Sequence, residues 1–199
     1  MIYIDKEPYT PKNSENSEII KELMSVIDDK GKVLNCIIAN EKEHYEFEAI
    51  DWENTKDIDI IIKTVTPIRL CLNTVEDAIG YIGRLIDAFN KIMVLYRDGK
   101  EKEGIKILSS AISGIEWVNS VIIKIEPVLG LDYQKLEVKG QKIVNYYGNY
   151  SSKLNELTEA IEAKDYFLSA DIIEYEIIPA FQGWLEFFKK LLKAFENAN

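Results

Sequence analysis

The chain has 199 residues and a net charge of −10, with 47% hydrophobic and 29% charged residues. An acidic chain without a basic cluster repels nucleic-acid phosphates and anionic membrane surfaces, which excludes both as expected partners. No apolar run reaches the roughly 18 residues of a membrane span, and the N-terminus lacks a signal-like basic and apolar segment. We therefore expect a soluble cytoplasmic protein.

Residues 1–66 are predicted to form a small acidic α+β domain with the element order β-α-β-β-β. Ile2–Asp5 is the first predicted strand, and Pro8 predicts a loop after it. A helix follows, because Asn16 or Ser17 can cap its start and Gly31 can take the left-handed conformation at its end. The predicted apolar face of this helix is Ile20, Leu23, Met24 and Ile27.

Three more strands are predicted after this helix. Lys32–Ala39 is mostly apolar, His44–Ile50 alternates apolar and polar residues, and Asp57–Val65 also alternates. The four residues at 40–43 form a plausible hairpin connection between the first two of these strands. The face that the alternation assigns to the core in the middle strand is Tyr45, Phe47 and Ala49.

An antiparallel four-helix bundle is predicted for residues 67–199. Thr66 and Pro67 mark the change of period from two residues to 3.6, since proline is favoured at the first helical position. The first helix carries an unbroken apolar stripe in steps of four and three, which must be buried against other helices. Its members are Ile68, Leu72, Val75, Ile79, Ile82, Ile86, Phe89, Met93 and Tyr96.

The second bundle helix is predicted from about Lys100 to Ile125, with Pro127 and Gly130 ending it. Its predicted core stripe is less regular: Ile105, Leu108, Ile112, Ile115, Val118, Ile122 and Ile125. The third helix covers roughly Tyr133 to Ala163, and a break near Lys164-Asp165 precedes the last. Pro179 lies inside that last helix and predicts a kink or restart at residues 175–179.

Six glycines fall inside the predicted helices, where each costs about 1 kcal/mol relative to alanine. They are Gly80, Gly83, Gly114, Gly140, Gly148 and Gly183. Close helix crossings, with an aromatic side chain from a neighbour filling the space, would compensate for this cost. A groove for a partner is the alternative at Gly80 and Gly83.

The function that the sequence favours is a non-catalytic protein-interaction module without a cofactor, such as an adaptor or a chaperone-like bundle that binds a partner protein or helix. In architecture alone, such a bundle resembles flagellar export chaperones. Phe187 lies off the apolar stripe of the last helix and is a further candidate contact, either with the β-containing domain or with a partner. The candidate partner-binding flank is Glu76, Gly80, Gly83, Asp87 and Asn90.

Two alternatives stay open. Acidic residues at three-residue spacing share a helix face and could hold Mg²⁺, in a manner similar to the acidic helices of all-α nucleoside-triphosphate pyrophosphohydrolases. The five candidate metal ligands are Glu159, Glu162, Asp165, Asp171 and Glu174. The single histidine, His44, excludes a di-metal site that needs two histidines. The other alternative is self-association as a structural homodimer.

Overall fold

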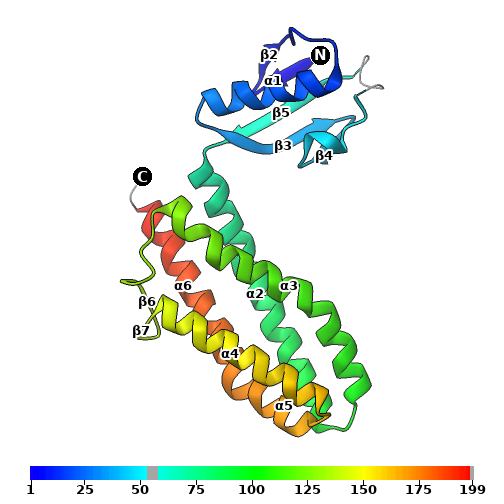
Figure 1. The fold of residues 1–199 in the computed structure, drawn as a ribbon. Helices are drawn as coiled ribbons and strands as arrows, with labels where there is room; N and C mark the ends of the chain where they lie inside the picture. Colours follow the sequence, from blue (N-terminus) through cyan, green and yellow to red (C-terminus); the bar gives the residue numbers. More distant parts are fainter. Residues whose placement is uncertain (53–57, 198–199) are drawn as a thin grey trace. The chain divides into compact units, whose positions relative to one another are not determined.

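The computed structural model describes residues 1–52 and 58–197. Most of these residues are helical, and a small mixed sheet lies in the N-terminal part, so the chain is α+β and predominantly α (Figure 1). The chain divides into two compact units, Met1–Cys71 and Leu72–Asn199. In the described ranges, no helix combines the length and the apolar character needed to cross a membrane.

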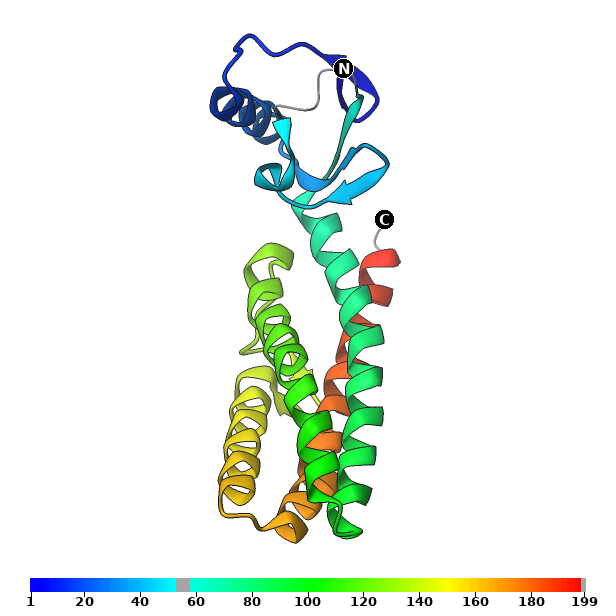
Figure 2. The same cartoon turned by 90° about the vertical axis from the view of Figure 1, so that its right-hand side faces the viewer.

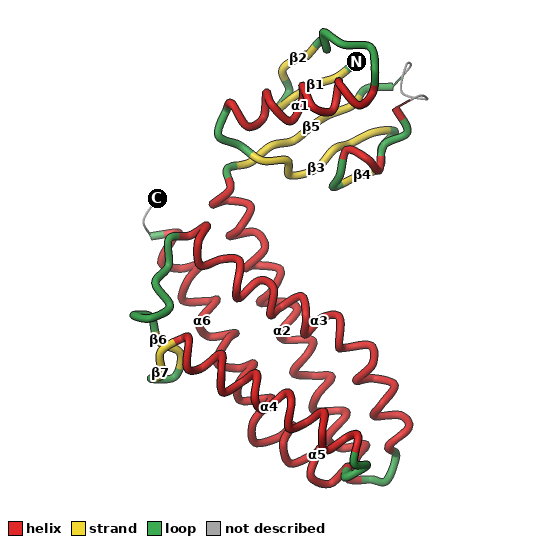
Figure 3. The backbone as a smooth tube through the Cα atoms, in the orientation of Figure 1, coloured by secondary structure: helices red, strands yellow, loops and turns green. Residues whose placement is uncertain are grey.

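The N-terminal unit consists of a five-stranded sheet and one α-helix, α1 (Asn16–Asp29), within the described residues. The strand order is β2-β1-β5-β3-β4 (Figure 3). Strand β1 is parallel to β5, and the other neighbours are antiparallel. The strands are β1 (Ile2–Ile4), β2 (Glu7–Tyr9), β3 (Val33–Ala39), β4 (Lys42–His44) and β5 (Ile60–Val65).

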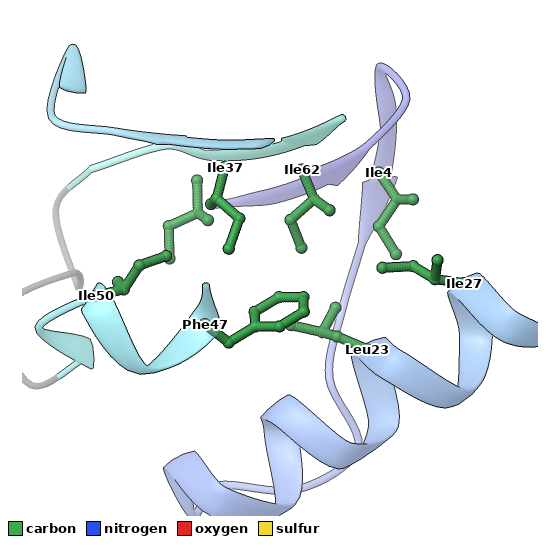
Figure 4. Close-up of a cluster of buried hydrophobic side chains, with 8 residues drawn as sticks. Ile4, Leu23, Ile27, Ile37, Phe47, Ile50 and Ile62 are labelled. Carbon is green, nitrogen blue, oxygen red and sulfur yellow. The ribbon is translucent and has the colours of Figure 1, made fainter. Parts of the chain in front are cut away.

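The core of this unit lies between the sheet and α1 (Figure 4). Ile37 of β3 and Ile62 of β5 are opposite each other in the sheet, so both side chains point to the same face, toward Leu23 of α1. A 3-10 turn, η1 (Phe47–Ala49), closes one side of this core with Phe47 and Ile50. Burial of each of these large apolar side chains contributes about 1.5–3 kcal/mol.

The predicted strand His44–Ile50 is wrong. Asn40 and Glu41 both have positive φ angles, 51° and 61°, so the chain reverses there and β4 already starts at Lys42, opposite Ala39. The chain then leaves the sheet, and the 3-10 turn buries Phe47 and Ile50 at a spacing of three. The alternation that predicted a strand therefore belongs to a bend followed by a turn.

Strand β2 is a further difference, because Pro8 lies inside it where a loop was predicted. β2 is an edge strand, and proline is tolerated at an edge since its missing N–H is needed by no neighbour. The sheet therefore has one strand more than predicted. Asp57, the first residue of the last predicted strand, lies outside the described residues, and β5 begins at Ile60.

The C-terminal unit contains long helices that run in alternating directions (Figure 2). A two-stranded hairpin, β6 (Glu137–Val138) and β7 (Gln141–Lys142), stands between the second and third of them. The helices are α2 (Pro67–Arg97), α3 (Glu101–Leu129), α4 (Ile143–Glu162), α5 (Tyr166–Ile172), the π-helical turn η3 (Ile173–Ile177) and α6 (Ile178–Glu196).

Helix α2 begins as its sequence predicts. The Thr66 hydroxyl accepts a hydrogen bond from the Arg69 amide at 3.2 Å, and Pro67 follows as the first helical residue. The buried stripe is rotated from the predicted one, since Ile68 is 47% exposed and Ala78 is fully buried. Steps of three and four still connect the buried residues: Leu72, Val75, Ala78, Ile82, Leu85, Phe89, Ile92 and Tyr96.

Two predicted helix boundaries are wrong. Helix α3 continues through Pro127 and ends at Gly130, whose φ is 62°; a proline in the last turn removes only one intrahelical hydrogen bond. Helix α4 begins at Ile143 rather than near Tyr133. The preceding residues form the β6–β7 hairpin, whose turn places Lys139 and Gly140 at positive φ. Gly140 is therefore a turn residue and not a helical one.

The last helical segment has the predicted break and restart. Lys164 takes a positive φ of 60°, and the carboxylate of Asp165 caps α5 by accepting from the Leu168 amide at 3.0 Å. The π-helical turn η3 then precedes Pro179, the second residue of α6. Lys139, in the turn between β6 and β7, donates a hydrogen bond from its Nζ to the Pro179 carbonyl at 2.9 Å.

Candidate functional site

The predicted glycine flank lies on α2 and is open. A Cβ atom built at Gly83 meets nothing within 4 Å, and one at Gly80 meets only the Arg84 guanidinium of the same helix, at 3.8 Å. Asp87 and Asn90 are exposed, although Asn90 donates to the Ile86 carbonyl at 2.9 Å and is thus bound to its own helix. Glu76 is exposed as well. The structure brings these residues together on one flank of α2.

Two other helical glycines have the structural role that the sequence predicted, whereas a Cβ atom built at Gly148 meets nothing within 4 Å. The ring of Tyr81 from α2 occupies the place of a side chain at Gly114 on α3. Tyr146 from α4 does the same at Gly183 on α6, where a Cβ atom would also lie 3.1 Å from Val138 Cγ1. These glycines allow helices to approach closely around aromatic rings, and they are not available to a partner.

Phe187 is part of the hydrophobic core. Its side chain is 9% exposed, and its ring centroid lies 6.5 Å from that of Tyr133, 6.1 Å from Trp184 and 5.8 Å from Phe188. The segment before the β6–β7 hairpin supplies Tyr133 and covers this side of α6. Phe187 therefore contributes to packing within its own unit and not to a partner surface.

The five acidic candidates do not form one cluster. Asp171 and Glu174 both bind the guanidinium of Arg97 at the end of α2, at 2.7 Å and 2.5 Å, and these hydrogen bonds raise the pKa of Arg97. Asp165 caps α5. Within residues 1–52 and 58–197, no three His, Cys, Asp or Glu side chains are placed to hold a metal ion together.

An apolar groove lies between α3 and α4 in the C-terminal unit. Its volume is about 430 Å³. Ile115 and Leu157 are buried at its base, whereas Ile112 is 49% exposed at its rim. The apolar walls are Ile105, Leu108, Ile112 and Ile115 from α3 and Leu154, Leu157 and Ile161 from α4.

The groove exists because α3 has two apolar faces. One face consists of small, buried residues, among them Ala111 and Gly114, and it receives the Tyr81 ring of α2. The other face carries the larger residues Leu108 and Ile112 and is only partly covered by α4. The sequence identified these isoleucines and leucines as core residues. The signal that could have revealed the second face is the width of the apolar surface on this helix.

The charged residues of this groove are both acidic. Glu116 of α3 and Glu162 of α4 are its only charged lining residues, and no lysine or arginine of the described ranges lines it. Ser109, Asn119 and Thr158 complete the lining. Glu162, predicted as a metal ligand in the enzyme alternative, thus borders an apolar groove.

Comparison with known proteins gives one match. The family model described as "Domain of unknown function (DUF8042)" matches residues 73–187, which is more than half of the chain. This span contains α3 and α4 completely, together with the glycine flank of α2. No match was found among curated proteins or among solved structures.

Proposed function

We propose that this chain is a non-catalytic interaction module that holds an amphipathic helix of a partner protein. The chain belongs to the family described as a domain of unknown function (DUF8042). The observation that carries the proposal is the apolar groove between α3 and α4, whose rim exposes Ile112. Grooves of this kind receive the apolar face of a helix, with anchors at i, i+3 or i+4, and i+7.

The length of the groove supports a helical occupant. The α3 wall runs from Ile105 to Ile115, which corresponds to about 15 Å at 1.5 Å per residue. Anchors at i and i+7 of a partner helix are about 10 Å apart. Two turns of a partner helix therefore fit along this wall.

The charge of the groove defines the chemistry of the partner. Glu116 and Glu162 flank the apolar walls, and the whole chain has a net charge of −10. A partner helix with lysine or arginine beside its apolar stripe would be attracted at long range and oriented on contact. We therefore expect a basic amphipathic helix.

The two alternative functions have less support. A Mg²⁺-dependent enzyme would need the predicted carboxylates together, yet Asp171 and Glu174 are bound to Arg97 and Asp165 caps a helix. In a structural homodimer, a second copy would occupy the groove. The like charges of Glu116 and Glu162 at the groove disfavour such self-pairing.

Fluorescence polarisation with a labelled synthetic peptide tests this proposal. The probe is an amphipathic helix with a leucine stripe flanked by lysines, added to the full chain. Ile112→Asp places a charge at the rim of the groove and should weaken binding by about tenfold or more, since about 1.4 kcal/mol corresponds to each factor of ten. Ile123→Asp is the matched control, because Ile123 is 57% exposed on the same helix and does not line the groove.

Three outcomes would overturn the proposal. The first is no binding of the peptide to the wild-type chain at high micromolar concentration. The second is equal loss of binding in Ile112→Asp and Ile123→Asp. The third is a wild-type dimer in sedimentation that Ile112→Asp converts to monomer, since a second copy would then be the occupant of the groove.

A further inference from the structure

One edge of the N-terminal sheet is only partly paired. Strand β4 pairs with β3 at Ile37–Ala39 alone. Of the preceding β3 residues, Val33, Leu34 and Cys36 pair with β5 on one side. No strand among the described residues pairs with residues 33–36 on the other side. An unpaired stretch of strand edge presents backbone N–H and C=O groups that can bind another extended chain.

A groove of about 750 Å³ lies beside this edge, within the N-terminal unit. Met24 and Ile27 of α1 line it on one side, and residues 45–48 line it on the other, with Val33 and Leu34 of β3 between them. Met24 is 54% exposed and Tyr45 is 69% exposed. The groove therefore joins an open strand edge to exposed apolar side chains.

The charge of this groove is negative. Asp28, Glu46 and Glu48 line it, and Lys32 is its only basic residue in the described part of the chain. The Lys32 ammonium lies 2.7 Å from the carboxylate of Asp5, so its charge is already compensated. An occupant with positive charge complements this surface.

We propose that an extended segment of a partner protein, with alternating basic and apolar residues, adds to the β3 edge in this groove. Backbone hydrogen bonds to residues 33–36 would hold the segment, as in other cases of strand addition. Its apolar side chains would contact Met24 and Phe47, and its basic side chains would contact Glu46 and Glu48. This site is separate from the α3–α4 groove and takes a strand instead of a helix.

A second copy of the chain is a poorer occupant than a basic segment. The register between β3 and β5 shifts between Leu34 and Cys36, and such a bulge prevents the edge from pairing with a long, flat strand. Self-pairing would also bring the acidic groups of two copies together. A short basic segment avoids the repulsion between acidic groups and needs only a few residues of the edge.

Fluorescence polarisation with a short labelled peptide of alternating lysine and valine tests the proposal on the full chain. We expect binding at low salt, and a loss of about tenfold or more when alternate peptide nitrogens are methylated, because methylation removes backbone donors without removing charge. Glu46→Lys with Glu48→Lys should weaken binding by a similar factor. Glu186→Lys with Glu196→Lys makes the same change of charge at exposed positions of the other unit and should have little effect.

Equal binding of the methylated peptide would overturn strand addition. Equal loss in the two double variants would show that only net charge matters and would overturn the assignment to this groove. No binding by the wild-type chain would overturn the proposal itself. Ile112→Asp keeps the two proposals separate, because it should leave the lysine–valine peptide bound, and loss of binding in that variant would place the peptide in the α3–α4 groove.

Discussion

Replacement of Gly183 by alanine tests the close approach of α6 to α4. The new methyl group would collide with the Tyr146 hydroxyl and would lie 3.1 Å from Val138 Cγ1. Tyr146 is held in place, because its hydroxyl donates to the Ala180 carbonyl at 3.0 Å and its ring packs edge-on against Trp184 at 5.2 Å between centroids. We therefore expect Gly183→Ala to destabilise the protein, although alanine favours helices.

The magnitude follows from the interactions of Tyr146. Displacement of the ring breaks one hydrogen bond, which contributes about 1 kcal/mol, and disturbs an aromatic pair that contributes about 0.5–1.5 kcal/mol. Overpacking of a dense core adds about 1–3 kcal/mol of strain, while the helix preference of alanine returns about 1 kcal/mol. The expected net loss in the free energy of unfolding is about 3 kcal/mol.

Urea denaturation followed by circular dichroism measures this loss as a lower midpoint with an unchanged slope. Gly83→Ala is the matched control, because its Cβ position is open, and it should raise the free energy of unfolding by about 1 kcal/mol. Stabilisation by Gly183→Ala would refute the argument from close packing. Destabilisation by Gly83→Ala would show that the glycine flank of α2 is covered.

Three further predictions concern single groups. Tyr146→Phe removes the hydrogen bond to Ala180 and should lower the free energy of unfolding by about 1 kcal/mol in urea denaturation. Partial burial alone would raise the pKa of Asp5, but hydrogen bonds from Lys32 and Thr64 outweigh it and lower the pKa from 3.8 to about 2. Asp5 should therefore stabilise the fold above pH 3.8, and this contribution should disappear as the pH falls through about 2. Urea denaturation of wild type and Asp5→Asn across this pH range measures the contribution. A difference in the free energy of unfolding that stays constant with pH would contradict the prediction. Millimolar Mg²⁺ should leave the thermal midpoint unchanged, and an increase that Glu162→Gln removes would support the metal-dependent alternative.

The boundaries that sequence predicted well are those fixed by a single capping residue. Thr66 with Pro67 begins α2, and Asp165, at the predicted break, begins α5, each through local backbone chemistry. The boundaries that failed depend on turns with positive φ at ordinary residues. Glu41 and Lys139 adopt this conformation, which side-chain type alone does not indicate. The hairpins at these turns replaced a predicted strand and the first turns of a predicted helix.

The candidate sites were harder to predict, because an apolar stripe does not indicate what covers it. Ile112 belongs to the predicted core stripe of its helix and is 49% exposed, whereas Phe187 lies off its stripe and is 9% exposed. Tyr133, from a segment predicted as helix, covers Phe187. The open groove on α3 and the closed surface on α6 both result from long-range packing, which periodicity does not record.

The π-helical turn η3 has a consequence for the length of the chain. Ile173, Ile177 and Phe181 are all buried at two successive steps of four, and eight residues of a regular α-helix would turn the two outer side chains about 80° apart. The wider π turn takes up one additional residue and returns α6 to the phase of α5. The last helical segment thus contains one residue more than its core requires. A deletion at this turn would shorten the segment without rotating one half of the core against the other, whereas a deletion in the middle of α2 would rotate half of its buried stripe by about 100°.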